Sequence, residues 1–440
     1  MKKNNPSLSI ENRFFAGCFI IFNLLISLSS CANAEAREDF KSSEDIITLS
    51  PVDAHIPDDF MRGFDASTVI RLEEKGAAFR GTDGNERDIF SLLKENGVNW
   101  IRLRIWNNPD ELTPGANNLT RTVDAAKRIK HNGLKFLLDF HYSDTWADTG
   151  EQKIPAAWSN LQSVDDIKNS LTDFTKSTLE ALKSAGAAPD AVQIGNEIDQ
   201  GLFISGVNNT ALQGDIAAHR TNLATYLNAA SAAVREKCPK AKIMIHLARG
   251  GDSDFVKWWF NHFAGSAPSV SQVDFDIIGL SYYPFYASHK SINNLKKTLS
   301  ECRTLYGKPV VVTETSFAWT VQSKDSTNNE FWYGAEAAAY DAFKDSAQIK
   351  KLDIYELNDK SLIGQPFYGK KAIRASIKNQ AELVRALIEV SAQAGASGLF
   401  YWGGDWISVP EHGSTWENQT FFDFDGKILP SAAVFNVAGK

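Results

Sequence analysis

Hydrophobic and polar positions along the chain form a repeated pair of patterns, an amphipathic helix followed by a short apolar strand. The segment 88–96 has apolar residues at helical spacing and stops at Gly97, and the apolar strand 100–106 comes next. Glycine directly after a helix is a common helix terminator, and near-continuous apolar strands are typical of a parallel sheet covered on both faces. The pairs that follow are 122–132 with 135–140, 167–186 with 191–195, 215–237 with 242–246, 292–302 with 309–314, and 378–394 with 397–402.

Two further apolar segments, 61–65 and 275–281, bring the predicted strands to eight. This pattern predicts the α/β class, with a (β/α)8 TIM barrel formed by a single domain with enlarged βα loops over residues 59–440. The alternative is a doubly wound open sheet, but neither a GxGxxG nor a GxxxxGK[ST] motif follows any predicted strand. The longest connection, 317–377, is rich in polar and aromatic residues, and connections of this length usually have a function.

The N-terminal region has the pattern of an export signal. Basic residues precede an apolar run at 14–28, which ends in Leu-Ser-Ser-Cys with Cys31 last. The run is shorter than the roughly 20 residues of a membrane-spanning helix and has the length of a secretory signal. We therefore expect residues 1–30 to be a lipoprotein signal peptide, Cys31 to be lipidated and the polar residues 31–58 to be a tether. Ordinary cleavage after Ala34 is the alternative. The protein is then exported, as a cell-envelope or cell-surface lipoprotein of a bacterium, or otherwise as a periplasmic or secreted protein.

Composition narrows the possible functions further. The 440 residues include 46 basic and 53 acidic ones, with a net charge of −7 and no basic stripe, which argues against nucleic-acid binding. Two of the 4 cysteines lie in the first 31 residues, so Cys238 and Cys302 are too few for a disulfide framework. Cys302 lies on an apolar helical stripe, and we expect it to be a buried thiol. The aromatic content of 11% matters because exposed rings are a common platform for ring-shaped ligands.

Carboxylic acids stand at the ends of two predicted strands. Asn196 and Glu197 follow the strand 191–195, and Glu314 ends the strand 309–314. Because barrel enzymes build their active sites at the C-terminal ends of the strands, these two glutamates are expected to face each other. Retaining glycoside hydrolysis requires two carboxyl groups about 5–5.5 Å apart, one protonated and one ionised. The pair predicts a glycoside hydrolase, although either glutamate alone is equally well interpreted as a cap or a surface ion pair.

Other polar and aromatic residues also stand at strand ends. Arg102 and Arg104 are candidates for keeping one carboxylate ionised, and Asp139 is a candidate partner of Arg102. His141 and His246 lack the spacing of a zinc site, so we interpret them as orienting or sugar-binding residues and predict no metal. Aromatic rings suit sugar C–H faces, although some of them are expected to plug the barrel mouth instead; they are Trp106, Trp146, Tyr282, Tyr283, Trp319, Trp402 and Trp406.

These motifs resemble glycoside hydrolase family 53, the endo-β-1,4-galactanases of the retaining (β/α)8 clan A. The resemblance runs from Arg62 to Asp425, and its most specific part is the sequence motif Ser-Asp-Thr-Trp-Ala-Asp at 143–148. The segments that carry it are 101–109, 139–148, 194–197, 242–247, 281–286 and 311–315.

The resemblance implies that Glu197 is the proton donor and acid/base and that Glu314 is the nucleophile. It also implies that Asn196 bonds the 2-hydroxyl of the reacting sugar and that Trp402 forms the floor of the subsite at the cleavage point. Arg102 and Tyr283 would hold the nucleophile. The complete set of supporting and substrate-binding residues that we expect is Arg102, Asn196, His141, Asp144, Trp146, His246, Tyr283 and Trp402.

The chain departs from the family pattern in three loops. The usual Trp-Glu-Pro-Ala-Trp after the last strand reads Trp-Gly-Gly-Asp-Trp at 402–406, and the usual acidic residue after the fifth strand is replaced at 248–252. Some bacterial relatives bind calcium after the seventh strand, but residues 323–329 lack that spacing. No cofactor is expected to be required, and calcium is not predicted.

The function that the resemblance implies is retaining endo-hydrolysis of β-1,4-galactan, the side chains of pectin, with release of galacto-oligosaccharides. The expected partners are this polysaccharide and its oligosaccharides, with membrane contact only through the lipid anchor, no nucleic acid, and a monomeric state. Another clan A endoglycanase, such as a mannanase, and a non-catalytic glycan-capture lipoprotein are the alternatives.

Overall fold

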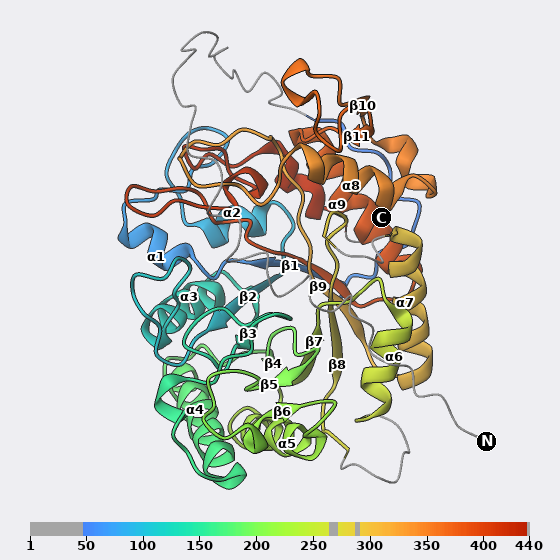
Figure 1. Cartoon of the computed structure of the whole chain (residues 1–440). Coiled ribbons are helices and arrows are strands. Elements are labelled where there is room, and N and C mark those ends of the chain that lie inside the picture. Colours follow the sequence, from blue (N-terminus) through green and yellow to red (C-terminus); the bar gives the residue numbers. More distant parts are fainter. Residues whose placement is uncertain (1–46, 264–271, 287–290, 438–440) are drawn as a thin grey trace, which may run out of the picture.

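A closed barrel of eight parallel strands forms the centre of the computed structural model, which describes residues 47–263, 272–286 and 291–437 (Figure 1). Around the barrel the strands follow the order β1-β12-β9-β8-β7-β4-β3-β2, and the (β/α)8 prediction is confirmed. The barrel strands are β1 (Met61–Asp65), β2 (Trp100–Ile105), β3 (Lys135–Phe140), β4 (Ala191–Ile194), β7 (Lys242–Leu247), β8 (Ile277–Ser281), β9 (Val310–Glu314) and β12 (Gly398–Tyr401).

Helices cover the outside of the barrel. They alternate with the strands along the chain, as the amphipathic segments of the sequence predict, and their apolar faces are buried against the sheet. Their bounds are α1 (Val69–Glu74), α2 (Ile89–Glu95), α3 (Leu119–His131), α4 (Val164–Ser184), α5 (Arg220–Lys237), α6 (Ser253–Asn261), α7 (Ile292–Tyr306), α8 (Tyr333–Phe343) and α9 (Ile377–Gln393). Helix α5 begins later than the predicted residue 215, because Gly214–Asp215 (β6) pairs with Gly201–Leu202 (β5).

The interior of the barrel is packed with side chains. Each of the eight strands contributes one residue to an inner cluster, which consists of Met61, Trp100, Leu137, Ala191, Met244, Ile277, Val311 and Phe400. Gly63 makes room for one of these rings, since a Cβ at this position would lie 2.1 Å from a ring carbon of Phe400. The barrel is therefore filled at this level, as in other barrels of this type, and its polar strand ends lie beyond the filling.

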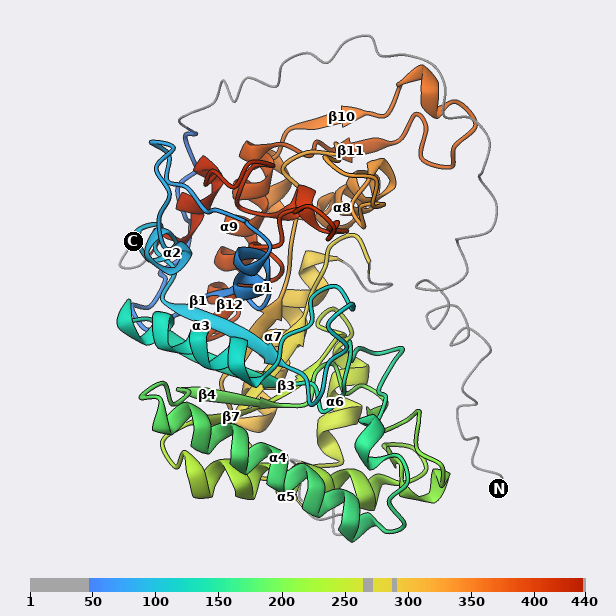
Figure 2. The same cartoon turned by 90° about the vertical axis from the view of Figure 1, so that its left-hand side faces the viewer.

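The long connection 317–377 is an ordered subdomain of the loop region. It contains α8 and a hairpin of Ile354–Glu356 (β10) and Lys371–Ile373 (β11), which projects from the barrel (Figure 2). A small apolar cluster of its own supports it, formed by Ala337, Leu357, Leu362, Phe367 and Ala372. The connection is therefore a folded part of the surface beside the barrel, with an apolar cluster of its own.

Residues 47–58 belong to the folded domain, which corrects the prediction that the tether extends to residue 58. Ile56 is fully buried, and the Ser50 amide donates to a carboxylate oxygen of Glu382 on α9 at 2.7 Å. Arg385, also on α9, donates to the Ser50 carbonyl at 3.0 Å. The predicted signal peptide, Cys31 and the rest of the predicted tether lie outside the described residues.

Two smaller expectations concern the thiols and the membrane. Cys238 and Cys302 are both buried and free, as predicted for Cys302. Within the described ranges, none of the helices combines the length and the apolar character that crossing a membrane requires.

Candidate active site

The turn after β4 presents the first of the two carboxyl groups. Gly195 has φ +98° and Glu197 has φ +46°, both in the left-handed region. A Cβ on Gly195 would lie 2.7 Å from the side chain of Ile198, which would have to shift, and the positive φ would strain any side chain there. A non-glycine residue with positive φ is uncommon, and such strain clusters at functional sites. The turn directs Glu197 toward Glu314 and His246 in the barrel mouth.

Strand β9 supplies the second carboxyl group. Glu314 is the last residue of β9 and is 5% exposed. One oxygen of Glu197, one oxygen of Glu314 and one ring nitrogen of His246 all lie within 4.8 Å of one another. The carboxyl groups are about 5–5.5 Å apart in retaining glycosidases and about 6.5–9.5 Å apart in inverting ones. The two glutamates are therefore at the spacing that suits direct attack on a sugar.

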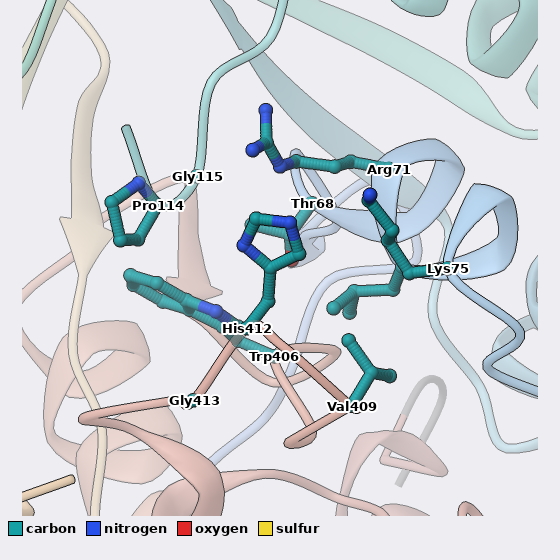
Figure 3. Close-up of a pocket in the computed structure, with 10 residues that line it drawn as sticks. Thr68, Arg71, Lys75, Pro114, Gly115, Trp406, Val409, His412 and Gly413 are labelled. Carbon is teal, nitrogen blue, oxygen red and sulfur yellow. The ribbon is translucent and has the colours of Figure 1, made fainter. Parts of the chain in front are cut away.

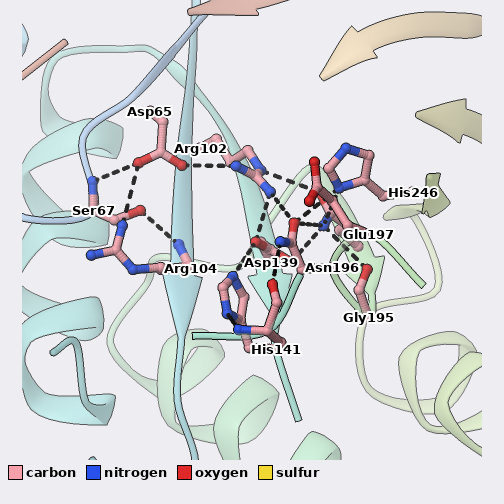
Figure 4. Close-up of polar contacts among 12 residues, drawn as sticks. Asp65, Ser67, Arg102, Arg104, Asp139, His141, Gly195, Asn196, Glu197 and His246 are labelled. Atoms are coloured by element: carbon pink, nitrogen blue, oxygen red, sulfur yellow. Dashed lines mark hydrogen bonds and ion pairs between the residues drawn. The ribbon is translucent and has the colours of Figure 1, made fainter. Parts of the chain in front are cut away.

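Arg102 forms an ion pair with Glu314 from within the barrel. Its Nη1 lies 2.9 Å from Oε1 of Glu314 and 3.0 Å from Oδ2 of Asp65, and its Nη2 lies 2.8 Å from Oδ2 of Asp139. The contacts of Arg102 with Asp65 and Asp139 can be followed in Figure 4. Burial opposes the charge of Arg102, but the three carboxylates raise the pKa of its guanidinium, so it stays protonated. The prediction that Asp139 is a partner of Arg102 is confirmed.

The surroundings of the two glutamates separate their proton affinities. Burial raises the pKa of Glu314, but Arg102 and the Tyr283 hydroxyl, which donates to Oε2 of Glu314 at 2.9 Å, oppose this rise. Burial also raises the pKa of Glu197, and there the charge of Glu314 adds to the effect. A pair with one proton therefore holds that proton on Glu197 and keeps Glu314 ionised.

Asn196 is fixed beside Glu197 by its polar contacts. Its Nδ2 donates to the Ala147 carbonyl at 2.7 Å, and its Oδ1 accepts from Nη2 of Arg102 at 2.8 Å and also lies 3.1 Å from Nε2 of Gln193 and 2.9 Å from Nδ1 of His246. Because the partners come from β2, β4, β7 and the loop after β3, the amide is held by several neighbouring parts of the barrel. Its position fits a group that orients a sugar hydroxyl.

His246 lies inside the barrel with both ring nitrogens against protein groups. The side chain is fully buried, and burial together with Arg102 lowers the pKa of the imidazole well below its ordinary value, so the ring is neutral. Its Nδ1 lies 3.1 Å from Nε2 of Gln193, and its Nε2 lies 2.8 Å from Oγ of Ser281. The Ser281 hydroxyl in turn donates to Oε1 of Glu197 at 2.6 Å. Of the two interpretations of His246 as orienting or sugar-binding, the structure supports the orienting one.

The group of Glu197, His246 and Glu314 has the spacing of a possible metal site within the described residues. Its donor atoms are already engaged, because both ring nitrogens of His246 have hydrogen-bond partners and Glu314 is paired with Arg102. A positively charged guanidinium at 2.9 Å from a ligand oxygen disfavours a second cation there. The donor set therefore fits proton transfer better than metal binding.

In the loop 323–329, where some bacterial relatives were said to bind calcium, the carboxylate of Asp325 is engaged by protein groups. Oδ1 of Asp325 accepts from the Thr327 amide at 2.6 Å. Its Oδ2 accepts from Oγ of Ser408 at 2.6 Å and from the Ser414 amide at 3.0 Å. Asp325 thus joins the loops after β9 and β12.

His141 lies behind the site as a structural residue. Its Nδ1 accepts from the indole N–H of Trp106 at 3.1 Å and from the Ala147 amide at 3.2 Å, and its Nε2 lies 3.1 Å from Oδ2 of Asp139. His141 is 3% exposed and Trp106 is fully buried. Both ring nitrogens of His141 therefore face protein partners, and a sugar contact of this ring is not supported by the geometry.

Three tryptophans form an aromatic rim at the barrel mouth. Trp146 stacks on Trp406 with ring centroids 5.7 Å apart, and Trp402 lies 6.0 Å from Trp146. Trp416 meets Trp402 edge-on at 4.6 Å. Trp106, Tyr282 and Trp319 are at most 2% exposed and Trp406 is 7% exposed, so these rings are packing residues, whereas Trp146 and Trp402 are partly exposed.

Arg104 supports the rim instead of the nucleophile. Its guanidinium lies 4.3 Å from the ring centre of Trp146, and it also donates to the Gly115 carbonyl. Its nearest carboxylate is that of Asp65, at 4.0 Å. Of the two candidate arginines, Arg102 alone contacts Glu314 in the structure.

Two acidic residues of the predicted loops are tied to protein groups. Asp144 accepts from the Asn108 amide at 2.9 Å and from the Ala156 amide at 2.8 Å, so it braces two loops, and its sugar contact stays a prediction. Asp405, which displaces the family's usual acidic residue, accepts from Oγ1 of Thr68 at 2.7 Å and is 1% exposed. It therefore points away from the cleft.

A narrow pocket separates this rim from helix α1. It lies behind Trp406 and is closed by His412 on one side and Arg71 on the other (Figure 3). Its free volume of about 10 Å³ is roughly that of one water molecule. This pocket does not open toward the glutamate pair and is too small for a sugar.

Three polar residues of the site were missed by the sequence analysis as site residues: Asp65, Gln193 and Ser281. Asp65 and Ser281 are the last residues of β1 and β8, and Gln193 lies inside the otherwise apolar strand β4. All three are at most 1% exposed. A buried polar residue in or at the end of a barrel strand is costly unless it is hydrogen-bonded, and this is the signal that could have found them.

Comparison with known proteins agrees with this geometry. The model of glycosyl hydrolase family 53 matches residues 61–356 and 351–435. An endo-beta-1,4-galactanase of Bacillus subtilis is 31% identical over 422 residues, covering 86% of each chain, and an arabinogalactan endo-beta-1,4-galactanase of Humicola insolens is 31% identical, covering 85% of this chain and 98% of its own. The solved GH53 catalytic domain of Ignisphaera aggregans is 34% identical, with a TM-score of 0.75, covering 90% of this chain and all of its own. The chain belongs to glycosyl hydrolase family 53, and it is a glycoside hydrolase.

Proposed function

We propose that the chain is a retaining endo-β-1,4-galactanase in which Glu197 is the acid/base and Glu314 the nucleophile. The observation that carries this proposal is the pair of glutamates with different surroundings. Burial raises the pKa of both, but Arg102 and Tyr283 oppose the rise at Glu314, whereas the charge of Glu314 adds to the rise at Glu197. Such a difference is what a two-carboxylate hydrolase needs at one pH.

The reaction follows from these two states. In the first step the Glu314 carboxylate attacks the anomeric carbon, and Glu197 gives its proton to the glycosidic oxygen as that bond breaks. In the second step Glu197, now ionised, takes a proton from water while the water oxygen replaces Glu314 on the anomeric carbon. Two inversions give net retention. Acid, base and nucleophile all come from the chain, so no cofactor is required.

The substrate class is supported by the relatives, whose printed names specify β-1,4-galactan or arabinogalactan. Trp146 and Trp402, which are partly exposed at the barrel mouth, supply aromatic surface for pyranose rings, while the buried Trp406 stacks on Trp146 from behind. Products are expected to be galacto-oligosaccharides released from within the chain, as for an endo-acting enzyme.

A surface hollow beyond the site also favours a polymer. It has a volume of about 370 Å³ and is lined by Tyr286 and Trp332, which are 42% and 49% exposed. The ring of Tyr286 lies 5.6 Å from that of Tyr283, which contacts the nucleophile. Because these two rings connect the hollow to the site, the hollow suits a long polysaccharide whose sugars far from the cleaved bond are bound there.

Azide rescue separates the roles of the two glutamates. With an activated aryl β-galactobioside, Glu197→Ala should still form the glycosyl-enzyme, and azide should restore turnover and give a β-glycosyl azide. Glu314→Ala should lose the intermediate, and azide attacking from its side should give the α-glycosyl azide. Product anomers are read by NMR. Retention of near wild-type galactan hydrolysis by either variant would refute the assignment.

A substrate panel tests the specificity. Galactan, mannan, xylan and cellulose are compared by reducing-end release, and galactan should be the preferred polymer. Exclusive hydrolysis of mannan would indicate a different endoglycanase, and binding without any reducing-end release would indicate a glycan-capture protein.

We also propose that the protein is exported and anchored through lipid on Cys31, and that it acts as a monomer. The basic start, the apolar run 14–28 and the Leu-Ser-Ser-Cys sequence support the anchor. Labelled fatty acid should be incorporated into the wild type and not into Cys31→Ala, and light scattering of the soluble domain should give the mass of one chain.

A further inference from the structure

We propose that Ser281, oriented by His246, is a positioning residue that reserves one carboxyl oxygen of Glu197 for the catalytic proton. This inference rests on the proposed acid/base role of Glu197. It concerns a serine that contacts the carboxyl group from the side of β8, within the barrel, where it is 1% exposed.

An irregularity between two strands places the serine. The pairing of β8 with β9 shifts between Leu280 and Ser281, so that Leu280 pairs with Val312 whereas Ser281 pairs with Glu314. Such bulges re-aim side chains at the ends of barrel strands. As a result, Oγ of Ser281 lies between two groups, 2.6 Å from Oε1 of Glu197 and 2.8 Å from Nε2 of His246.

The single hydrogen of the serine hydroxyl defines the direction of both bonds. When it is donated to Oε1 of Glu197, Nε2 of the neutral His246 has to be the donor to Oγ. Nδ1 then accepts from Nε2 of Gln193 at 3.1 Å, and the second hydrogen of that amide group is donated to Oδ1 of Asp139 at 2.6 Å. In the other tautomer Nδ1 would donate to Oδ1 of Asn196 at 2.9 Å, Ser281 would donate to His246, and Glu197 would lose its donor. The tautomer of His246 thus decides whether Ser281 donates to Glu197.

A donor at Oε1 has two consequences for Glu197. The proton of the neutral acid is placed on Oε2, from which it moves to the glycosidic oxygen in the first step and to which a water proton is transferred in the second. Ser281 keeps its own proton throughout. A hydrogen bond to the charged form also opposes a rise in pKa, here against burial and the negative charges that face Glu197: Glu314 on β9, Asp199 in its own segment and Asp148 in the loop after β3. The uncharged neighbours His246 and Tyr283 complete its surroundings.

The test is the basic limb of the kcat/KM profile on galactan, because Glu197 has to be protonated in the first step. Ser281→Ala removes a donor to the carboxylate, so we expect the basic limb to move to higher pH by about one unit, with a lower kcat. Ser281→Thr keeps a hydroxyl and should restore the wild-type limb. On an aryl substrate whose leaving group needs no acid, the wild type and Ser281→Ala should have the same basic limb.

The role of the histidine is tested by a matched pair of variants. The amide of His246→Gln reaches the position of Nε2 and keeps a donor for Ser281, whereas the shorter side chain of His246→Asn does not. We expect the first to keep the wild-type basic limb and the second to shift it as Ser281→Ala does. Ser391→Ala, which removes another fully buried serine hydroxyl in α9, is the control and should leave the profile unchanged.

A folded Ser281→Ala whose basic limb is unchanged on galactan overturns the proposal. If Ser281→Ala does not fold, identical profiles of His246→Gln and His246→Asn overturn it in the same way. Failure of the proposed function is distinct, since it would appear as absent galactan hydrolysis by the wild type or as normal hydrolysis by Glu197→Ala.

Discussion

Replacement of Tyr283 by phenylalanine tests how the nucleophile is kept ionised. The hydroxyl donates to Oε2 of Glu314 at 2.9 Å, while Arg102 independently pairs with Oε1 at the same distance. Tyr283→Phe removes this one donor and keeps the ring. A hydrogen bond to a charged group contributes about 1.5–3 kcal/mol, and a shift of one pKa unit corresponds to about 1.36 kcal/mol. The pKa of Glu314 should therefore rise by about one to two units.

The sign of the effect on activity follows from the role of Glu314. Because the nucleophile has to be ionised, activity is lost as the pH falls through its pKa, and a raised pKa moves the acidic limb of kcat/KM to higher pH. The assay is the initial rate on galactan between pH 4 and 9, with Tyr286→Phe as the control, since its hydroxyl donates to Glu330 at 3.0 Å. A uniform fall in kcat/KM with an unmoved acidic limb would refute the reasoning, because the hydroxyl would then act on the sugar.

Three further predictions concern the rim, the turn and the remote surface. Burial raises the pKa of Asp405 to about 7, above the ordinary value of about 3.9, so the ionised carboxylate destabilises the fold increasingly as the pH rises from about 4 to 7. Asp405→Asn should therefore raise Tm at pH 8 and not at pH 4.5. Equal changes of Tm at both pH values would contradict this. Gly195→Ala, with φ +98° and a Cβ 2.7 Å from Ile198, should cost about 1–3 kcal/mol and lower both Tm and kcat/KM, whereas Gly76→Ala, with φ +92° in open space, should lower only Tm. Trp332→Ala should reduce kcat/KM several-fold on galactan but not on galactotriose, with Trp258→Ala, at 42% exposure on α6, as the control; equal losses on both substrates would exclude a remote binding surface.

Much of the fold could be predicted because its signals are local. Strands such as Lys135–Phe140 and Val310–Glu314 are short apolar runs between helices that end at a glycine, and both were predicted within one residue. The start of α5 could not be predicted, because residues that fit the helical pattern form a short strand pair instead, between Gly201–Leu202 and Gly214–Asp215. Likewise, residues 47–58 have the composition of a tether, and their burial depends on α9, more than 300 positions later.

The candidate site divides in the same way. Glu197, Glu314, Asn196 and Arg102 could be proposed from the sequence, because a charged or polar residue at the end of a buried strand is costly and needs a reason. Tyr283 was also noted as an aromatic residue at a strand end, but its contact with the nucleophile was implied by the resemblance to the family. Ser281 could not be proposed as a site residue from the sequence, because a single serine at a strand end is usually structural. Its contacts with Glu197 and His246 depend on a bulge between two strands.

The sequence by itself determined the eight-stranded barrel and the identity of the two acids, because strand length, helical periodicity and residue type at strand ends are properties of neighbouring positions. The resemblance to the family implied which glutamate donates the proton and that Arg102 holds the other one. Only the tertiary structure supplied the contacts of each glutamate and of each arginine, and showed which aromatic rings stay accessible. These depend on distances of about 3–6 Å between residues that are tens to hundreds of positions apart, and interactions between charges and hydrogen-bonding groups change steeply over that range. Arg102 and Arg104 show the difference: they stand two positions apart with the same chemistry, yet one lies 2.9 Å from the nucleophile and the other packs against Trp146.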